Sequence, residues 1–173
     1  MFASLKKVRA VLDQLLLSLC GVIIILLVAA VSWQVFSRYI LNDPSTFTDE
    51  IARFMMIWLG LLGASFLFGK NGHLAITLLS DSLSPKLQAA LQTLIGILVV
   101  LFAYLAMFSG GITLMGRTMF QISPALGIPM GYVYGILPIS ACLICFYVLL
   151  NIIDLLFPHK GAEASNNPSA KEE

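Results

Sequence analysis

The residues best suited to chemistry are two acids and a base, Asp49, Glu50 and Arg53, which precede an uncharged apolar run over 54–69. Glu50 and Arg53 are three residues apart, so they share a helix face and can form an ion pair. Because a bilayer core takes about 20 apolar residues as a helix, the pair is expected at or just inside one membrane interface. Two interpretations are open. The pair is either a solvated contact that contributes little, or a partly buried pair, with Arg38 nearby, that presents charge to a partner outside the membrane.

Three further polar or aromatic side chains flank the apolar runs. Trp58 lies about two turns after Glu50 and is expected to pack in the interior. His73 follows the run and is either a polar turn residue or a group whose protonation acts as a switch. Arg117 follows the third apolar run and is expected on the same side of the membrane as Arg38.

The sequence offers no arrangement for catalysis. Cys142 and Cys145 have a C-x-x-C spacing, which is found in redox and metal sites. They lie in an apolar run, however, where a thiol behaves as a small hydrophobic group. His73 and His159 are expected on one side of the membrane, away from any nucleophile. No charged residue is expected at mid-bilayer depth, where transport pathways usually place ionisable groups. These features indicate a scaffold or accessory subunit without a cofactor or a metal.

The composition is that of a membrane protein. The chain has 173 residues, of which 59% are hydrophobic and 11% charged. This length leaves no room for a membrane part and a separate folded soluble domain. The net charge of +1 argues against a nucleic-acid partner.

Hydropathy predicts an all-α membrane protein with four transmembrane helices. The transmembrane domain is expected over 15–157, with spans at about 15–39, 47–68, 88–115 and 132–156. Amphipathic in-plane helices that contact membrane lipids are expected at the N-terminus and between spans two and three, over 1–14 and 74–83. Pro138 predicts a kink in the fourth span. The polar segment 158–173 is expected to be a disordered cytoplasmic tail.

The distribution of lysine and arginine predicts the orientation. One side collects more basic residues than the other and is expected to be cytoplasmic: Lys6, Lys7, Arg9, Lys70, Lys86 and Lys160. Both termini are then expected to be cytoplasmic, in a multi-pass membrane protein. The loop over 117–131 is apolar, contains prolines and lies outside, so it is expected to pack on its own helices or on a partner.

Small residues form strips along the spans, as they do where membrane helices pack closely. The strips are Gly60 with Gly63 and Ala64, Ala103 with Ala106 and Gly110, and Gly131 with Gly135. Packing within the chain and packing with a partner are both compatible with this pattern.

Several of these segments together resemble a known family. They are Asp49-Glu50-Ile51-Ala52-Arg53, Trp58-Leu59-Gly60, Gly72-His73-Leu74-Ala75-Ile76, Pro124-Ala125-Leu126-Gly127-Ile128-Pro129 and Leu137-Pro138-Ile139. The combination is similar to the small (Q-type) membrane subunit of tripartite ATP-independent periplasmic (TRAP) transporters, over nearly all of residues 10–157. Ala75-Ile76 departs from the family, which would have a basic residue followed by valine.

The resemblance implies a role in transport rather than catalysis. It implies a large TRAP membrane subunit that carries the sodium and substrate sites and moves as an elevator. It also implies a periplasmic substrate-binding protein that delivers an organic acid, such as a sialic acid or a C4-dicarboxylate. The small subunit would extend the fixed scaffold. The residues that it implies as interface or docking candidates are Arg38, Glu50, Arg53, Trp58, His73 and Arg117.

Two other four-span proteins are alternatives. A stand-alone multidrug exporter would need a carboxylate that faces a cavity within the membrane, for which Glu50 is the candidate. A thiol oxidoreductase would need cysteines in the outer loops, and the sequence of the segments 41–47 and 117–131 contains none.

Overall fold

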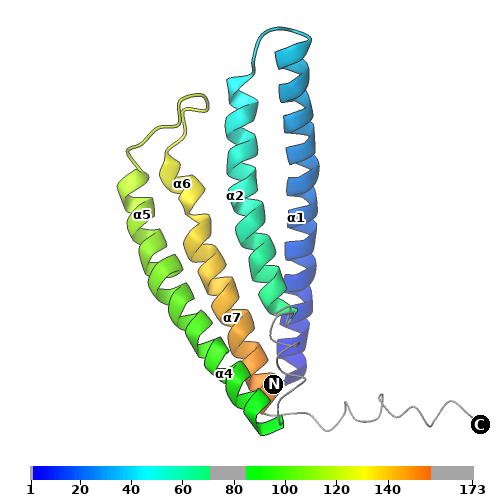
Figure 1. Cartoon of the computed structure of the whole chain (residues 1–173), viewed down its shortest axis with the longest axis vertical. Helices are drawn as coiled ribbons and strands as arrows, with labels where there is room; N and C mark the ends of the chain where they lie inside the picture. Colours follow the sequence, from blue (N-terminus) through cyan, green and yellow to red (C-terminus); the bar gives the residue numbers. More distant parts are fainter. Residues whose placement is uncertain (1, 71–84, 157–173) are drawn as a thin grey trace, which may run out of the picture.

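A computed structural model of the chain describes residues 2–70 and 85–156 and contains helices but no strand in that part (Figure 1). The first and second spans are α1 (Phe2–Tyr39) and α2 (Thr46–Gly69). The third is made of α4 (Pro85–Phe102), the π-helix η1 (Ala103–Ser109) and α5 (Gly110–Thr118), and the fourth of α6 (Met130–Tyr134) and α7 (Ile136–Leu156). Four stretches are long and apolar enough to cross a membrane: Lys7–Tyr39, Thr46–Gly69, Ala90–Thr118 and Met130–Ile153. The predicted all-α membrane fold with four spans is confirmed.

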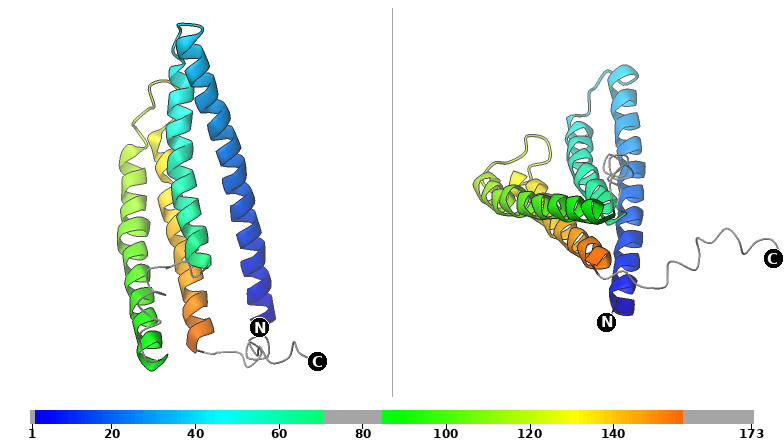
Figure 2. Two further views of the ribbon diagram at one scale, coloured as in Figure 1. Left: turned by 45° about the vertical axis from the view of Figure 1, so that its right-hand side comes forward. Right: turned by 60° about the horizontal axis from the view of Figure 1, so that its bottom comes forward.

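The spans stand side by side in the order α1, α2, α7 and then the third span (Figures 1 and 2). One group of buried side chains joins α1, α2 and the fourth span, and it includes Leu16, Leu62 and Tyr147. A second group joins η1 to α7 through Ala103, Ile144 and Val148. The connection from α1 to α2 and the loop from α5 to α6 lie at the same end of the molecule. We call this the outer end, and we call the other the inner end.

The segment expected as a separate in-plane helix over 1–14 is continuous with the first span. α1 runs unbroken from Phe2 to Tyr39, because no glycine or proline interrupts residues 2–20. Leu12 packs against the buried group that includes Leu16. The other expected in-plane helix, 74–83, lies outside the described residues, as do His73, His159 and the tail at 158–173.

The π-helix in the third span was not expected. Hydropathy does not distinguish a π-helix from an α-helix, since both are runs of apolar residues. In η1, Ala103 is only 1% exposed and Met107 is partly buried, and both pack against the second buried group on α7. The π-helix therefore forms a central part of the contact between the third and fourth spans.

The fourth span is interrupted three residues before the expected kink at Pro138. α6 ends at Tyr134, and α7 begins at Ile136. Proline has no N–H group, and its ring collides with the carbonyl group four residues earlier in a regular helix, which here belongs to Tyr134. The break leaves the carbonyl oxygen of Val133 available, and it accepts a hydrogen bond from Nε1 of Trp58 at 3.1 Å. Trp58 packs in the interior, as expected, and it also compensates for the break.

The strips of small residues differ in what they face. A methyl group at position 131 would lie 2.8 Å from the carbonyl oxygen of Met115, so Gly131 allows α5 and α6 to approach closely. Gly60 and Gly63 have no side-chain or backbone neighbour within 4 Å of such a methyl group. In the third span it is Gly111, next to the expected Gly110, that packs against Leu137.

Candidate functional site at the outer end of α2

The first turn of α2 is positioned by a tight connection from α1. Asn42 has φ of 51°, a left-handed conformation that asparagine adopts more readily than most residues. The backbone N–H of Ser45 donates to Oγ of Ser37 at 3.3 Å, and Oγ1 of Thr48 donates to the carbonyl oxygen of Ser45 at 3.0 Å. Ser37 and Thr48 are both buried. These contacts fix where the two acids that follow, Asp49 and Glu50, are placed.

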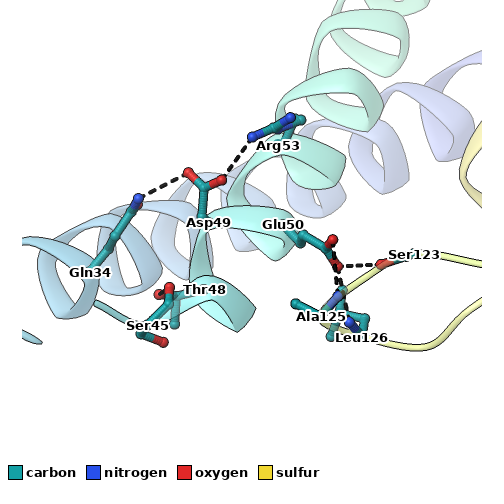
Figure 3. A network of polar contacts seen from close by, with 9 residues as sticks. All are labelled: Gln34, Ser45, Thr48, Asp49, Glu50, Arg53, Ser123, Ala125 and Leu126. Carbon is teal, nitrogen blue, oxygen red and sulfur yellow. Dashed lines mark hydrogen bonds and ion pairs between the residues drawn. The ribbon is translucent and has the colours of Figure 1, made fainter. Parts of the chain in front are cut away.

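Asp49 connects α2 to α1. Its Oδ1 accepts a hydrogen bond from Nε2 of Gln34 at 2.9 Å, and its Oδ2 pairs with the guanidinium group of Arg53 at 2.8 Å (Figure 3). The side chains of Arg53 and Asp49 are 66% and 47% exposed. The expected ion pair between Glu50 and Arg53 is therefore wrong. Arg53 pairs one position earlier, at the i, i+4 spacing, because the carboxylate of Glu50 is turned the other way.

Glu50 holds the loop between α5 and α6 (Figure 3). The hydroxyl group of Ser123 donates a hydrogen bond to Oε2 of Glu50. The backbone N–H groups of Ala125 and Leu126 donate to the same carboxylate at 3.2 and 3.0 Å. We call this set of contacts, Glu50 with Ser123, Ala125 and Leu126, the loop clamp. It shows that the apolar loop packs on its own helices through a carboxylate.

The loop itself is a compact hairpin-like turn. Ser123 N–H donates to the carbonyl oxygen of Ile128 at 2.9 Å, and Gly127 N–H donates to that of Ser123 at 3.0 Å. Gly127 has φ of +69°, which favours glycine because it has no Cβ atom. Two apolar side chains lie between α5 and this turn, with Phe120 92% and Ile122 68% exposed. The clamp thus holds a loop that carries exposed apolar side chains at the outer end.

The remaining candidates are dispersed. The guanidinium carbon of Arg38 lies 5.8 Å from the centre of the Tyr39 ring, in a cation–π arrangement rather than beside Glu50. Arg117 is exposed in the last turn of α5. Trp58 lies below the loop clamp in α2, bonded to Val133. His73 falls outside the part of the chain that the structure describes.

A second polar cluster, at the inner end, was missed by the sequence analysis. Asp13 of α1 accepts a hydrogen bond from the hydroxyl group of Tyr147 at 2.8 Å and pairs with Nζ of Lys70 at 3.0 Å. Arg9 donates to the carbonyl oxygen of Gly69. We call Arg9, Asp13, Gly69, Lys70 and Tyr147 the inner cluster. Asp13 was the one acid among the basic residues before the first span, and that isolation was a signal for a buried partner.

The loop clamp and the inner cluster are suited to holding helices and loops in place rather than to catalysis. The loop clamp occupies the carboxylate of Glu50 with three donors at the outer end. The arrangement that a multidrug exporter needs, with this carboxylate facing a cavity within the membrane, is therefore not what Glu50 forms. Within residues 2–70 and 85–156, no group of three His, Cys, Asp or Glu side chains is placed to hold a metal ion.

Comparison with known proteins identifies the family. Residues 27–157 match the family described as "Tripartite ATP-independent periplasmic transporters, DctQ component". A TRAP transporter small permease protein of Haemophilus influenzae is 30% identical over 139 residues, which cover 80% of this chain and 86% of that protein.

Two relatives are named for a sialic acid transporter. The sialic acid TRAP transporter small permease protein SiaQ of Vibrio cholerae is 28% identical over 163 residues, which cover 93% of this chain and 92% of that protein. The sialic acid TRAP transporter permease protein SiaT of Haemophilus influenzae is 26% identical over 113 residues, which are 65% of this chain and 18% of that longer protein. This chain belongs to the DctQ family: it is the small, non-enzymatic permease subunit of a TRAP transporter and works in the inner membrane with a large membrane subunit and a periplasmic binding protein.

Proposed function

We propose that this chain is the fixed scaffold subunit of a sodium-coupled importer of an organic acid, and that its outer end is a docking platform for the periplasmic binding protein. The observation that carries this proposal is the loop clamp, in which Glu50 holds the apolar loop between α5 and α6. A surface held in one conformation loses less entropy when a partner binds. The clamp therefore favours docking at this loop.

The residues around the clamp have the chemistry of a protein interface. Phe120 and Ile122 are exposed apolar side chains in the part of the loop that directly follows α5. The exposed ion pair of Asp49 and Arg53 lies beside Glu50, in the first two turns of α2. Aromatic residues and arginine are the side chains that most often dominate the binding energy of interfaces. We include Arg38 and Arg117 in this surface as charges that steer the approach of the binding protein.

The distribution of basic residues supports an orientation that exposes this surface to the periplasm. In the described part of the chain the outer-end segments carry three basic residues, Arg38, Arg53 and Arg117, and the inner-end segments carry five, Lys6, Lys7, Arg9, Lys70 and Lys86. Cytoplasmic segments are richer in lysine and arginine. We therefore place both termini in the cytoplasm and the two outer connections in the periplasm.

We assign the sodium and substrate sites to the large subunit, and we expect no cofactor in this chain. The relative SiaT supports close contact of the two membrane parts, since the region similar to this chain makes up 18% of that longer permease. Sialic acid is the substrate that we propose, because the relative SiaQ aligns with 93% of this chain. A C4-dicarboxylate is the alternative substrate.

Transport in proteoliposomes tests the function. Vesicles that contain both membrane subunits, with the binding protein outside, are expected to take up labelled sialic acid when a sodium gradient is imposed. Uptake of C4-dicarboxylates instead would overturn the substrate assignment. Uptake by vesicles that contain this chain alone would overturn the scaffold role.

Docking is tested with variants of the clamp and of the exposed apolar residues of the loop. Glu50→Gln removes the charge that holds the loop, and Phe120→Ser changes the exposed apolar surface while leaving the clamp intact. Each is expected to weaken binding of the binding protein to the two-subunit complex by about tenfold. The control is Ile25→Ala, at an exposed position on α1 far from the outer end, which is expected to leave binding unchanged. Unchanged binding by both variants would contradict the docking role, and an altered choice of substrate would place these residues in the transport pathway.

A further inference from the structure

Tyr104 places a polar group at the middle of the membrane. It lies in η1, 14 residues from each end of the third apolar span, since 104 − 90 and 118 − 104 both equal 14. At about 1.5 Å per residue, each end of the span is about 20 Å away, which is beyond the reach of a tyrosine side chain. The side chain of Tyr104 is nonetheless 57% exposed. Tyr104 therefore lies on the outer surface of this chain, at a depth of the membrane that contains no water.

The ring of Tyr104 has a stacking partner within the chain, but its hydroxyl group has no hydrogen-bond partner in the described part of the chain. The ring stacks on that of Phe108, with the centroids 6.0 Å apart and the planes 12° apart. The hydrogen bonds found within the described part of the chain do not include one to this hydroxyl group. Lipid tails offer no acceptor, and a hydroxyl group left without one in an apolar medium is costly.

The packing of η1 prevents the phenol from turning inward. Ala103 and Met107 occupy the face that packs against α7, where Ile144 and Val148 are buried. Tyr104 and Phe108 follow these two residues in sequence and so occupy the adjacent, outward face. The acceptor for the phenol must accordingly come from another molecule.

We propose that the face of the third span formed by Tyr104 and Phe108 packs against a transmembrane helix of the large subunit, which supplies a hydrogen-bond acceptor to the phenol at mid-membrane depth. The large subunit is the membrane partner that belongs to a TRAP transporter, so this inference rests on the assembly of the two subunits.

Removal of the hydroxyl group of Tyr104 tests the proposal. Tyr104→Phe keeps the ring and its stacking on Phe108. Interhelical hydrogen bonds in membranes correspond to about three- to twentyfold in association, so the variant is expected to bind the large subunit weaker by that factor. The matched control is Tyr132→Phe: Tyr132 is 63% exposed and lies near the outer end, where water can bond its hydroxyl group. Association is measured by fluorescence energy transfer between the labelled subunits in lipid vesicles.

Photo-crosslinking gives an independent measurement. A photoreactive phenylalanine analogue at position 108 is expected to crosslink to the large subunit in the assembled complex. Crosslinks to lipid alone, or to a second copy of this chain, would overturn the proposal, as would equal association of the Tyr104→Phe variant and the wild type. If the wild-type subunits themselves fail to associate, assembly fails and the scaffold role fails with it. If the wild-type subunits associate and the Tyr104→Phe variant associates equally well, only the proposed contact of Tyr104 is refuted, and the scaffold role stands.

Discussion

Asp49 and Glu50 are consecutive residues of α2, but their carboxylates bind opposite neighbours. Asp49 accepts a hydrogen bond from Gln34 of α1 at 2.9 Å, and Glu50 accepts one from the backbone of Leu126 in the loop before α6 at 3.0 Å. Consecutive residues of a helix point about 100° apart, which is why one dipeptide can hold two elements. The first turn of α2 thereby sets the position of both outer connections.

The two carboxylates are expected to act separately. Glu50→Gln is expected to accelerate hydrogen exchange at the amides of Ala125 and Leu126 by about tenfold, because these amides lose their charged acceptor. Asp49→Asn is the control, since it alters the contacts with Gln34 and Arg53 and leaves the loop clamp in place. Equal exchange in the two variants would show that the loop holds its shape without Glu50. Exchange is followed by mass spectrometry of peptides from the loop.

The inner cluster is expected to stabilise the junction of α1, α2 and α7. Tyr147 is fully buried, and its hydroxyl group donates to the carboxylate of Asp13. Tyr147→Phe is expected to lower the free energy of unfolding by about 1.5–3 kcal/mol, the usual contribution of a hydrogen bond to a charged group. Tyr39→Phe, at a position 72% exposed, serves as the control. Thermal unfolding in detergent gives the comparison, and equal midpoints for the two variants would refute the contribution.

Trp58 is expected to protect the interruption of the fourth span. Its Nε1–H bonds the carbonyl oxygen of Val133, which lies where α6 gives way to α7. Trp58→Phe removes this donor and is expected to cost about 1–3 kcal/mol of stability, because the carbonyl group is left without a partner in an apolar environment. Trp33→Phe changes a tryptophan that is 53% exposed and provides the reference. If both substitutions lower the unfolding midpoint equally, the hydrogen bond to Val133 does not contribute to stability.

Two glycines are expected to respond differently to the same added methyl group. At Gly131 the methyl carbon would lie 2.8 Å from the backbone oxygen of Met115, whereas at Gly60 nothing lies within 4 Å. Gly131→Ala is therefore expected to separate α5 from α6 at a cost of about 1–3 kcal/mol. Gly60→Ala is expected to be tolerated by the isolated chain. Unfolding in detergent of the two purified variants measures this, and a tolerant position 131 would contradict the close contact.

The number and location of the four spans were predictable because they depend on local composition. Four apolar runs and the breaks between them are properties of the sequence within windows of about 20 residues. The interruption of the fourth span follows almost as directly from Pro138, because proline acts on the carbonyl group four residues earlier. The π-helix was not predictable in this way, since its residues are as apolar as those of the α-helical turns on either side.

The polar contacts were not predictable, because they join residues far apart in the sequence. Glu50 and Ser123 are 73 residues apart, and Asp13 and Tyr147 are 134 apart. Helical spacing suggested Arg53 as the partner of Glu50, but the donors in the loop occupy that carboxylate. The partners of Asp13 could not be identified without knowing that α2 ends beside it and that Tyr147 of α7 lies next to it.

Attachment at both ends has a mechanical consequence for α2. Its first turn is bonded to α1 and the loop, and its last turn is bonded to Arg9 and Asp13 through Gly69 and Lys70. A translation of α2 along its axis by one helical pitch, about 5.4 Å, would break the bonds at both of its ends. A rotation about that axis would break them as well. Within this row of helices α2 therefore cannot move along its axis without losing contacts at both of its ends. Such an attachment suits the fixed scaffold role that we propose for this subunit.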